Sequence, residues 1–359
     1  MSPSSPTSRI IRLATRGSAL ALAQAEKVRG EFARAFPSRT FELMVVKTTG
    51  DQLPTLSLVN PDASLPRGLF TKELEVALLA GEAEIAVHSL KDLPTDLPEG
   101  LLLAATPPRE DVREVLLYRA ATVPETHPHH HDWRPGQREP LFGEPGLILA
   151  QLPQGAVVAT SSTRRAAAVK IVRPDVVVVP IRGNVGTRLR KLRDSCDFDV
   201  TILAAAGLLR LHFDIGPRGE LRIDPRLPAS SRAEVTPPPS GLLATLLEPE
   251  QLLPAVGQGA LGLEVRADDD DARTLCLALN HTNTFAAVSA ERALLSALGG
   301  GCQTPVAAYA RVLGHQLRME AVRYFDGQAI VAQGTRPVRE ALELGREVGA
   351  RLVEGLLKN

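Results

Sequence analysis

Cys302 ends the run Gly299-Gly300-Gly301 and precedes Gln303-Thr304-Pro305, so its thiol stands in a turn with few side chains. The segment before this turn is predicted to be a helix, because its apolar residues recur at helical spacing: Phe285, Val288, Leu294, Leu295 and Leu298. A thiol just past a helix end is accessible to a large group that attaches to it. A lone cysteine is more often a small apolar residue in a tight turn, so its role depends on the rest of the chain.

Arginines and hydroxyl residues gather where predicted strands end, which is where open α/β sheets bind ligands. The turns Arg16-Gly17-Ser18 and Thr160-Ser161-Ser162 each lead into a helix, whose free N–H groups and dipole favour an anion. Arg164 and Arg165 fall in a first helical turn, where positive charge opposes the dipole, so we expect a negative partner. One arginine alone is more often solvated or in a structural ion pair. Together, five arginines predict a polycarboxylate or phosphate site: Arg16, Arg164, Arg165, Arg182 and Arg188.

A third cluster, His88-Ser89-Leu90-Lys91-Asp92-Leu93-Pro94, also follows a predicted strand. A lysine and a carboxylate side by side at a strand end form a charged pair, in which Asp92 is free to stabilise a cationic intermediate. The alternative is that Asp92 only caps a turn before Pro94.

The composition narrows the class of protein. The chain has 359 residues, 44% hydrophobic and 4% aromatic, and its 41 lysines and arginines balance 41 aspartates and glutamates. Zero net charge and few aromatics argue against a nucleic-acid-binding protein. Three cysteines suggest a reducing compartment rather than a disulfide framework. We find no candidate membrane span or secretory signal, and expect a cytoplasmic protein.

Alternating strand and helix patterns predict α/β domains with largely parallel sheets. The first unit has predicted strands at 10–14, 41–46, 84–88 and 101–105, with helices at 18–35 and 71–80. The second has strands at 156–159, 176–181 and 200–204, with helices at 162–172 and 184–194. Residues 306–312, 317–322 and 329–333 suggest a small antiparallel sheet, and 338–357 a closing helix.

Two motifs suggest other functions, dinucleotide binding and metal binding, which their contexts do not support. Gly257-Gln258-Gly259-Ala260-Leu261-Gly262 has dinucleotide-binding spacing, but it precedes a predicted strand and lacks an acidic residue about 20 positions on, so we reject an oxidoreductase. The Pro-, His- and Gly-rich segment 122–146 is predicted to be a surface insertion. Its histidines have no second ligand cluster, so we expect no metal site: His127, His129, His130 and His131.

Six segments in order resemble the porphobilinogen deaminase family: Phe70-Thr71-Lys72-Glu73-Leu74, Ala86 to Pro94, Thr160 to Arg165, Arg182 to Leu189, Ala255 to Ala260 and Gly300 to Pro305. The resemblance covers nearly the whole chain. It implies two lobes like those of type II periplasmic binding proteins, with mixed sheets, and a small α+β C-terminal domain. The implied domains are 1–113 with about 254–278, then 114–253, then 279–359.

The resemblance also implies an activity. Members of the family carry a dipyrromethane cofactor, here on Cys302 through a thioether. They deaminate porphobilinogen, couple four molecules head to tail on that primer and release hydroxymethylbilane for haem biosynthesis. A cytoplasmic monomer is implied, with porphobilinogen as its small-molecule partner. The alternative is a non-catalytic anion-binding protein of the periplasmic-receptor type.

Site roles follow from the same resemblance, position by position. Asp92 matches the catalytic carboxylate. The expected cofactor-binding residues are Cys302, Ser89, Lys91, Asp92, Thr160, Ser161, Ser162, Arg164, Arg165, Arg182, Gly183 and Arg188. The expected substrate-binding residues are Arg16, Ser18, Arg67, Arg182, Arg188, Arg210 and Gln258. Arginine suits these roles because its planar fork binds carboxylates with two hydrogen bonds and stays ionised.

Overall fold

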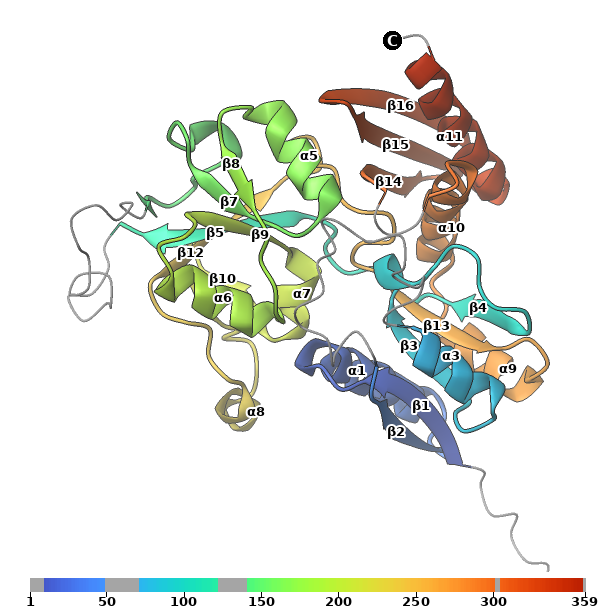
Figure 1. The fold of residues 1–359 in the computed structure, drawn as a ribbon. Helices are drawn as coiled ribbons and strands as arrows, with labels where there is room; N and C mark the ends of the chain where they lie inside the picture. The colour runs from blue at the N-terminus through green and yellow to red at the C-terminus, as the bar shows by residue number, and fades with distance from the viewer. Residues whose placement is uncertain (1–9, 49–70, 122–140, 301–303, 358–359) are drawn as a thin grey trace, which may run out of the picture.

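Two mixed sheets and one small antiparallel sheet form the three cores of the computed structural model (Figure 1). The structure describes residues 10–48, 71–121, 141–300 and 304–357. We call the sheet that contains the N-terminal strand lobe one, the sheet that the chain enters next lobe two, and the C-terminal sheet with its helices the third domain.

In lobe one the strand order is β2-β1-β3-β13-β4. The strands are β1 (Ile10–Arg16), β2 (Thr40–Val46), β3 (Ile85–Ser89), β4 (Leu101–Ala105) and β13 (Leu261–Arg266). The helices are α1 (Ala19–Ala35), α3 (Lys72–Leu79) and α9 (Asp270–Ala278), and η1 (Leu90–Asp92) is a single 3₁₀ turn after β3. The core contains Phe32 of α1, whose ring stacks on Phe41 of β2 with centroids 5.1 Å apart.

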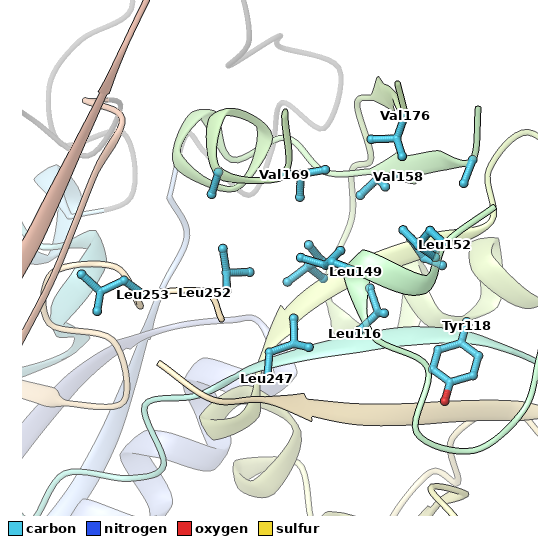
Figure 2. Packing of buried hydrophobic residues seen from close by; sticks show 14 of the residues in the cluster. Leu116, Tyr118, Leu149, Leu152, Val158, Val169, Val176, Leu247, Leu252 and Leu253 are labelled. Atoms are coloured by element: carbon cyan, nitrogen blue, oxygen red, sulfur yellow. The ribbon is translucent and has the colours of Figure 1, made fainter. Parts of the chain in front are cut away.

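In lobe two the strand order is β12-β5-β9-β7-β8, and β6 pairs with β5. The strands are β5 (Glu114–Ala120), β6 (Phe142–Gly143), β7 (Val157–Ala159), β8 (Val177–Val179), β9 (Val200–Ala204) and β12 (Leu242–Leu247). Around them lie η2 (Leu149–Gln151), α5 (Thr163–Val172), α6 (Val185–Asp194), α7 (Ala205–Arg210), the hairpin β10 (Phe213–Ile215) and β11 (Leu221–Ile223), and α8 (Ala229–Glu234). Figure 2 shows one face of this sheet, where Leu116 and Val158 pack with Val169 of α5 and Leu149 of η2.

The two lobes repeat one topology. Read as β2-β1-β3-β13-β4 and β8-β7-β9-β5-β12, both sheets have a single strand, β13 or β5, that runs against its two neighbours. Each reversed strand follows a segment in which the chain crosses between lobes, residues 106–113 before β5 and 248–260 before β13. The prediction of largely parallel sheets therefore holds except for these inserted strands, and the implied mixed sheets are confirmed.

The two crossing segments lie against each other. Glu110 N–H donates to Gly259 C=O (3.0 Å) and the Gln258 amide donates to Val112 C=O (2.8 Å). Gly259 has φ +83°, and a Cβ there would lie 2.4 Å from the carbonyl oxygen of Glu110. Glycine is required at this position by both the backbone conformation and the close approach.

The third domain packs α10 (Thr282–Ala297) and α11 (Ala341–Leu357) on the sheet β14 (Val306–Leu313), β15 (Gln316–Phe325) and β16 (Gln328–Pro337). The turn η3 (Val338–Glu340) precedes α11. Figure 1 shows these helices on one side of the sheet, with α5 of lobe two near the other. The predicted helix and antiparallel sheet are confirmed. No helix among the described residues has the length and hydropathy needed to cross a membrane.

Candidate functional site

In lobe one, the end of β3 and the turn η1 present Lys91 and Asp92. Leu90 and Leu93 on either side are buried, so the two charged residues, both half-buried, are held between apolar anchors. Leu90 N–H donates to Ala260 C=O (3.0 Å), and the Ser89 hydroxyl lies 2.9 Å from the amide nitrogen of Gln24 on α1. The turn is thus fixed on both sides before any ligand binds.

In lobe two, the hydroxyls after β7 build the turn that starts α5. Ser162 caps the helix, accepting from Arg165 N–H (3.3 Å), and Thr160 Oγ1 accepts from Ser162 N–H (3.2 Å). The Ser161 hydroxyl donates to Ile181 C=O (2.8 Å) and accepts from Ile181 N–H (3.1 Å). These three residues, predicted to bind cofactor, also hold the turn together. The hydroxyls of Thr160 and Ser162 act only as acceptors in these contacts, so each can still donate to a ligand carboxylate.

The negative partner expected for Arg164 and Arg165 is a residue of the chain, Glu114, which sequence reasoning missed. Glu114 begins β5 and is fully buried. Its carboxylate accepts from Arg165 Nε (3.1 Å) and Nη2 (2.7 Å), and also from Arg164 Nη2. Burial alone would raise the pKa of Glu114, but the two guanidinium groups outweigh it and lower this pKa to about 2. The arginines also donate to the carbonyls of Leu253 (2.7 Å) and Ile202 (2.9 Å).

The charged groups of the two lobes act on one another. Burial lowers the pKa of Lys91 to about 8, with Asp92 opposing the shift and Arg165 of lobe two adding to it. Burial likewise lowers the pKa of Arg188 to about 10, with Arg165 and Arg182 adding to the shift and Asp92 opposing it. Asp92 and the arginines of lobe two therefore share one electrostatic neighbourhood.

The turn between β8 and α6 positions Arg182 and Arg188. Gly183 has φ +115°, and a Cβ there would lie 2.6 Å from the Thr187 side chain. Arg188 Nε donates to Gly183 C=O (2.8 Å), which holds its guanidinium at the helix start. Nη2 of Arg182 and Nε of Arg164 are buried and have no hydrogen-bond partner among the described residues. Buried N–H groups of this kind call for an acceptor from a ligand or water.

Four other predicted substrate-binding residues differ in placement. Ser18 caps α1, accepting from Ala21 N–H (3.3 Å), and half-buried Arg16 ends β1. Arg210 donates to Gly259 C=O (2.6 Å), so it contacts the crossing segment, and burial lowers its pKa to about 10. Gln258 is fully buried within that segment. Its predicted contact with substrate stays a prediction.

Cys302 and Arg67 lie outside the described residues, as does most of the segment 122–146 with its histidines. Among the residues that are described, no group of three or more His, Cys, Asp or Glu side chains is arranged to hold a metal ion. The side chains that are placed suit a ligand with several carboxylates: the unpartnered N–H groups of Arg164 and Arg182 are donors, and Arg188 adds a guanidinium beside them. An acidic dipyrromethane has such acceptors.

Two family models match nearly the whole chain. The porphobilinogen deaminase dipyrromethane cofactor binding domain matches residues 11–274, and the C-terminal domain of porphobilinogen deaminase matches residues 285–354. The porphobilinogen deaminase of Syntrophobacter fumaroxidans is 37% identical over 97% of this chain and 96% of its own, and that of Geobacter metallireducens 39% identical over 96% and 91%. The aliphatic sulphonate binding protein SsuA of Escherichia coli is a distant structural neighbour, 10% identical with a TM-score of 0.35, covering 97% of this chain and 88% of its own.

Proposed function

The chain belongs to the porphobilinogen deaminase family, and we propose that Asp92 and the strand-end arginines of lobe two form its active site. The protein is a transferase, a hydroxymethylbilane synthase of tetrapyrrole biosynthesis, and it uses a dipyrromethane cofactor. The proposed site is supported by the electrostatic effect of Asp92 in lobe one on Arg188 in lobe two, and by the buried N–H groups of Arg164 and Arg182 that have no partner among the described residues.

In this proposal Asp92 stabilises positive charge. As substrate loses ammonia, the bond between its aminomethyl carbon and nitrogen breaks and the pyrrole nitrogen becomes electron-poor. A carboxylate held beside that nitrogen lowers the energy of the cationic species, and does so again before the newly bonded ring gives up a proton. The anchors Leu90 and Leu93 suit this role, because a preorganised group needs no reorientation during the reaction.

The arginines bind carboxylate groups. When bound, the cofactor supplies the pyrrole carbon to which the first substrate is joined, and Cys302 is the proposed point of attachment. Arg182 and Arg188 border the place where acetate and propionate groups of cofactor and substrate would lie. Arg164 and Arg165 add two buried guanidinium groups beneath it. Glu114 pairs with both Arg164 and Arg165, so these two buried charges do not lack a carboxylate. Lys91 adds an ammonium group from lobe one.

Further proposals concern organisation. We place the domain limits at 1–113 with about 254–278, 114–253 and 279–359. Support comes from β13, which completes the sheet of lobe one, and from β12, which completes that of lobe two. A cytoplasmic monomer with neither nucleic-acid nor membrane partners is also proposed. The balanced net charge and the three cysteines support it.

Intact-mass measurement and one variant test the proposal. Purified protein is expected to exceed the mass of its bare chain by two condensed pyrroles, and Cys302→Ala to lose that increment. Asp92→Asn is expected to keep the increment but to form product about 10²–10³-fold more slowly, the range for loss of one preorganised electrostatic group. Near-normal product formation by Asp92→Asn would remove Asp92 from its role. A bare mass in protein that binds porphobilinogen without consuming it would favour the anion-binding alternative.

A further inference from the structure

The turn that carries Asp92 is packed against a helix of the third domain. Val288 of α10 is fully buried in a cluster with Leu90 and Leu93, the two residues that flank Lys91 and Asp92. Ala260, which accepts the hydrogen bond of Leu90 N–H, belongs to the same cluster. The apolar side of the turn therefore rests on a different domain from the strand that precedes it.

One turn further along α10, Arg292 contacts the backbone that follows Asp92. Its Nη1 donates to Leu93 C=O (3.0 Å), and its Nη2 donates to Pro94 C=O (2.6 Å) and Thr95 C=O (3.1 Å). Residues four apart on a helix share a face, so Val288 and Arg292 form one contact surface toward the turn. A guanidinium fork spans several acceptors at fixed geometry, which a lysine ammonium cannot do.

The helix is itself firmly held beside this contact. Glu291, adjacent to Arg292, is fully buried and accepts from Arg109 Nη1 (2.7 Å) and Nη2 (3.0 Å). It also accepts from Gly257 N–H (2.7 Å) of the second crossing segment and from Ala310 N–H (2.9 Å) of β14. Arg292 thus extends from a fixed base, so the positions of the three carbonyls follow from the position of α10.

We propose that Arg292 is a positioning residue for the reaction: through the carbonyls of Leu93, Pro94 and Thr95 it fixes the turn so that the Asp92 carboxylate meets the reacting pyrrole. The inference rests on the proposed role of Asp92. Arg292 donates to the backbone of the turn, so in this inference it acts on the placement of the carboxylate. Misplacement by about 1 Å can cost up to about 10²-fold in rate without weakening substrate binding in proportion.

Arg292→Gln tests this, because glutamine is too short and has too few donors to hold three carbonyls. Arg173→Gln is the control. In lobe two, Arg173 donates to the carbonyls around η2, at Leu149 (3.3 Å), Leu152 (2.5 Å) and Pro153 (3.2 Å), and it also pairs with Asp175 (2.7 Å). We expect both variants to carry the cofactor mass, and Arg173→Gln to lose at least as much thermal stability, because it also gives up the ion pair with Asp175. Only Arg292→Gln should lower kcat, by about 10-fold or more, with KM for porphobilinogen within about 2-fold of wild type.

Two further variants keep the test decisive. Arg292→Lys restores the charge but only part of the geometry, so its kcat should fall between wild type and Arg292→Gln. Val288→Ala loosens the apolar half of the contact and replaces Arg292→Gln as the test variant if that protein does not fold. Its kcat should fall by a larger factor than its KM for porphobilinogen rises. Equal kcat for Arg292→Gln and Arg173→Gln, or a normal kcat for Val288→Ala where Arg292→Gln does not fold, would overturn the inference. Asp92→Asn run alongside separates the two claims: if it is slow while Arg292→Gln is normal, only the positioning role fails.

Discussion

The two lobes share one strand order, but among the predicted site residues only lobe one supplies a carboxylate. At the end of β3, lobe one presents Asp92 beside a lysine whose pKa is lowered to about 8. At the ends of β7 and β8, lobe two presents arginines. The reversed strand of each sheet also carries one fully buried glutamate: Glu264 of β13 lies 2.8 Å from His88, whereas Glu114 of β5 pairs with Arg164 and Arg165. The same strand order thus carries the catalytic carboxylate proposed for lobe one and the arginines of lobe two. A few residues at the strand ends determine this difference.

The largest effect should come from removing the glutamate of lobe two. Glu114→Gln leaves two buried guanidinium groups without their carboxylate, so we expect a loss of about 3–5 kcal/mol in the unfolding free energy. Glu264→Gln is the counterpart in lobe one. There a single imidazole contact is lost instead of contacts with two guanidinium groups, so the loss should be closer to about 1–3 kcal/mol. Urea unfolding of both variants measures the difference, and an equal or larger loss for Glu264→Gln would contradict the contrast between the lobes.

The pH dependence of stability should have opposite origins in the two lobes. The pKa of Glu114 is lowered to about 2, so its stabilising contribution is complete above the usual carboxyl pKa and is lost as the pH falls toward 2. The pKa of Lys91 is lowered to about 8, so folding disfavours its charged form, and stability should rise between pH 8 and the usual lysine pKa near 10.5.

Urea unfolding midpoints measured from acid to alkaline pH check both the loss of stability toward pH 2 and the rise above pH 8. Lys91→Met should abolish the alkaline rise and keep the acid loss, while Glu114→Gln should weaken the acid loss and keep the alkaline rise. An alkaline rise that survives in Lys91→Met would assign it to another group.

The smallest effect concerns the helix that opens each lobe. Ser18 caps α1 and Ser162 caps α5, each accepting one backbone N–H at 3.3 Å. Ser→Ala at either position should cost about 1 kcal/mol. We expect Ser162→Ala to cost more, because Arg164 and Arg165 in the first turn of α5 already oppose the helix dipole. Thermal unfolding of the two variants compares them; equal losses would show that Glu114 cancels this repulsion fully.

Local signals predicted most of the elements because their causes are local. The alternating strand and helix patterns located α1 and α5 to within one residue. The family resemblance, rather than any local pattern, suggested that Asp92 and Arg188 belong to one site, and this stays a prediction. Long-range pairing was not visible in the same way. Nothing near Glu114 indicates that its partners lie about 50 residues later, since an acidic residue before an apolar run is also how an exposed strand begins. The hydroxyls of Thr160, Ser161 and Ser162 suggested an anion site, but no local signal showed that they also hold the turn together.

The position of β13 has a consequence for biosynthesis. All five strands on the main path of the lobe-two sheet come from residues 114–247 without interruption, so a ribosome releases that lobe as a complete folding unit. Lobe one is synthesised earlier, but its sheet is incomplete at that stage. Its four earlier strands lack the strand between β3 and β4 until Leu261–Arg266 has left the exit tunnel. The sheet of the half that is made first is therefore the sheet that is completed second.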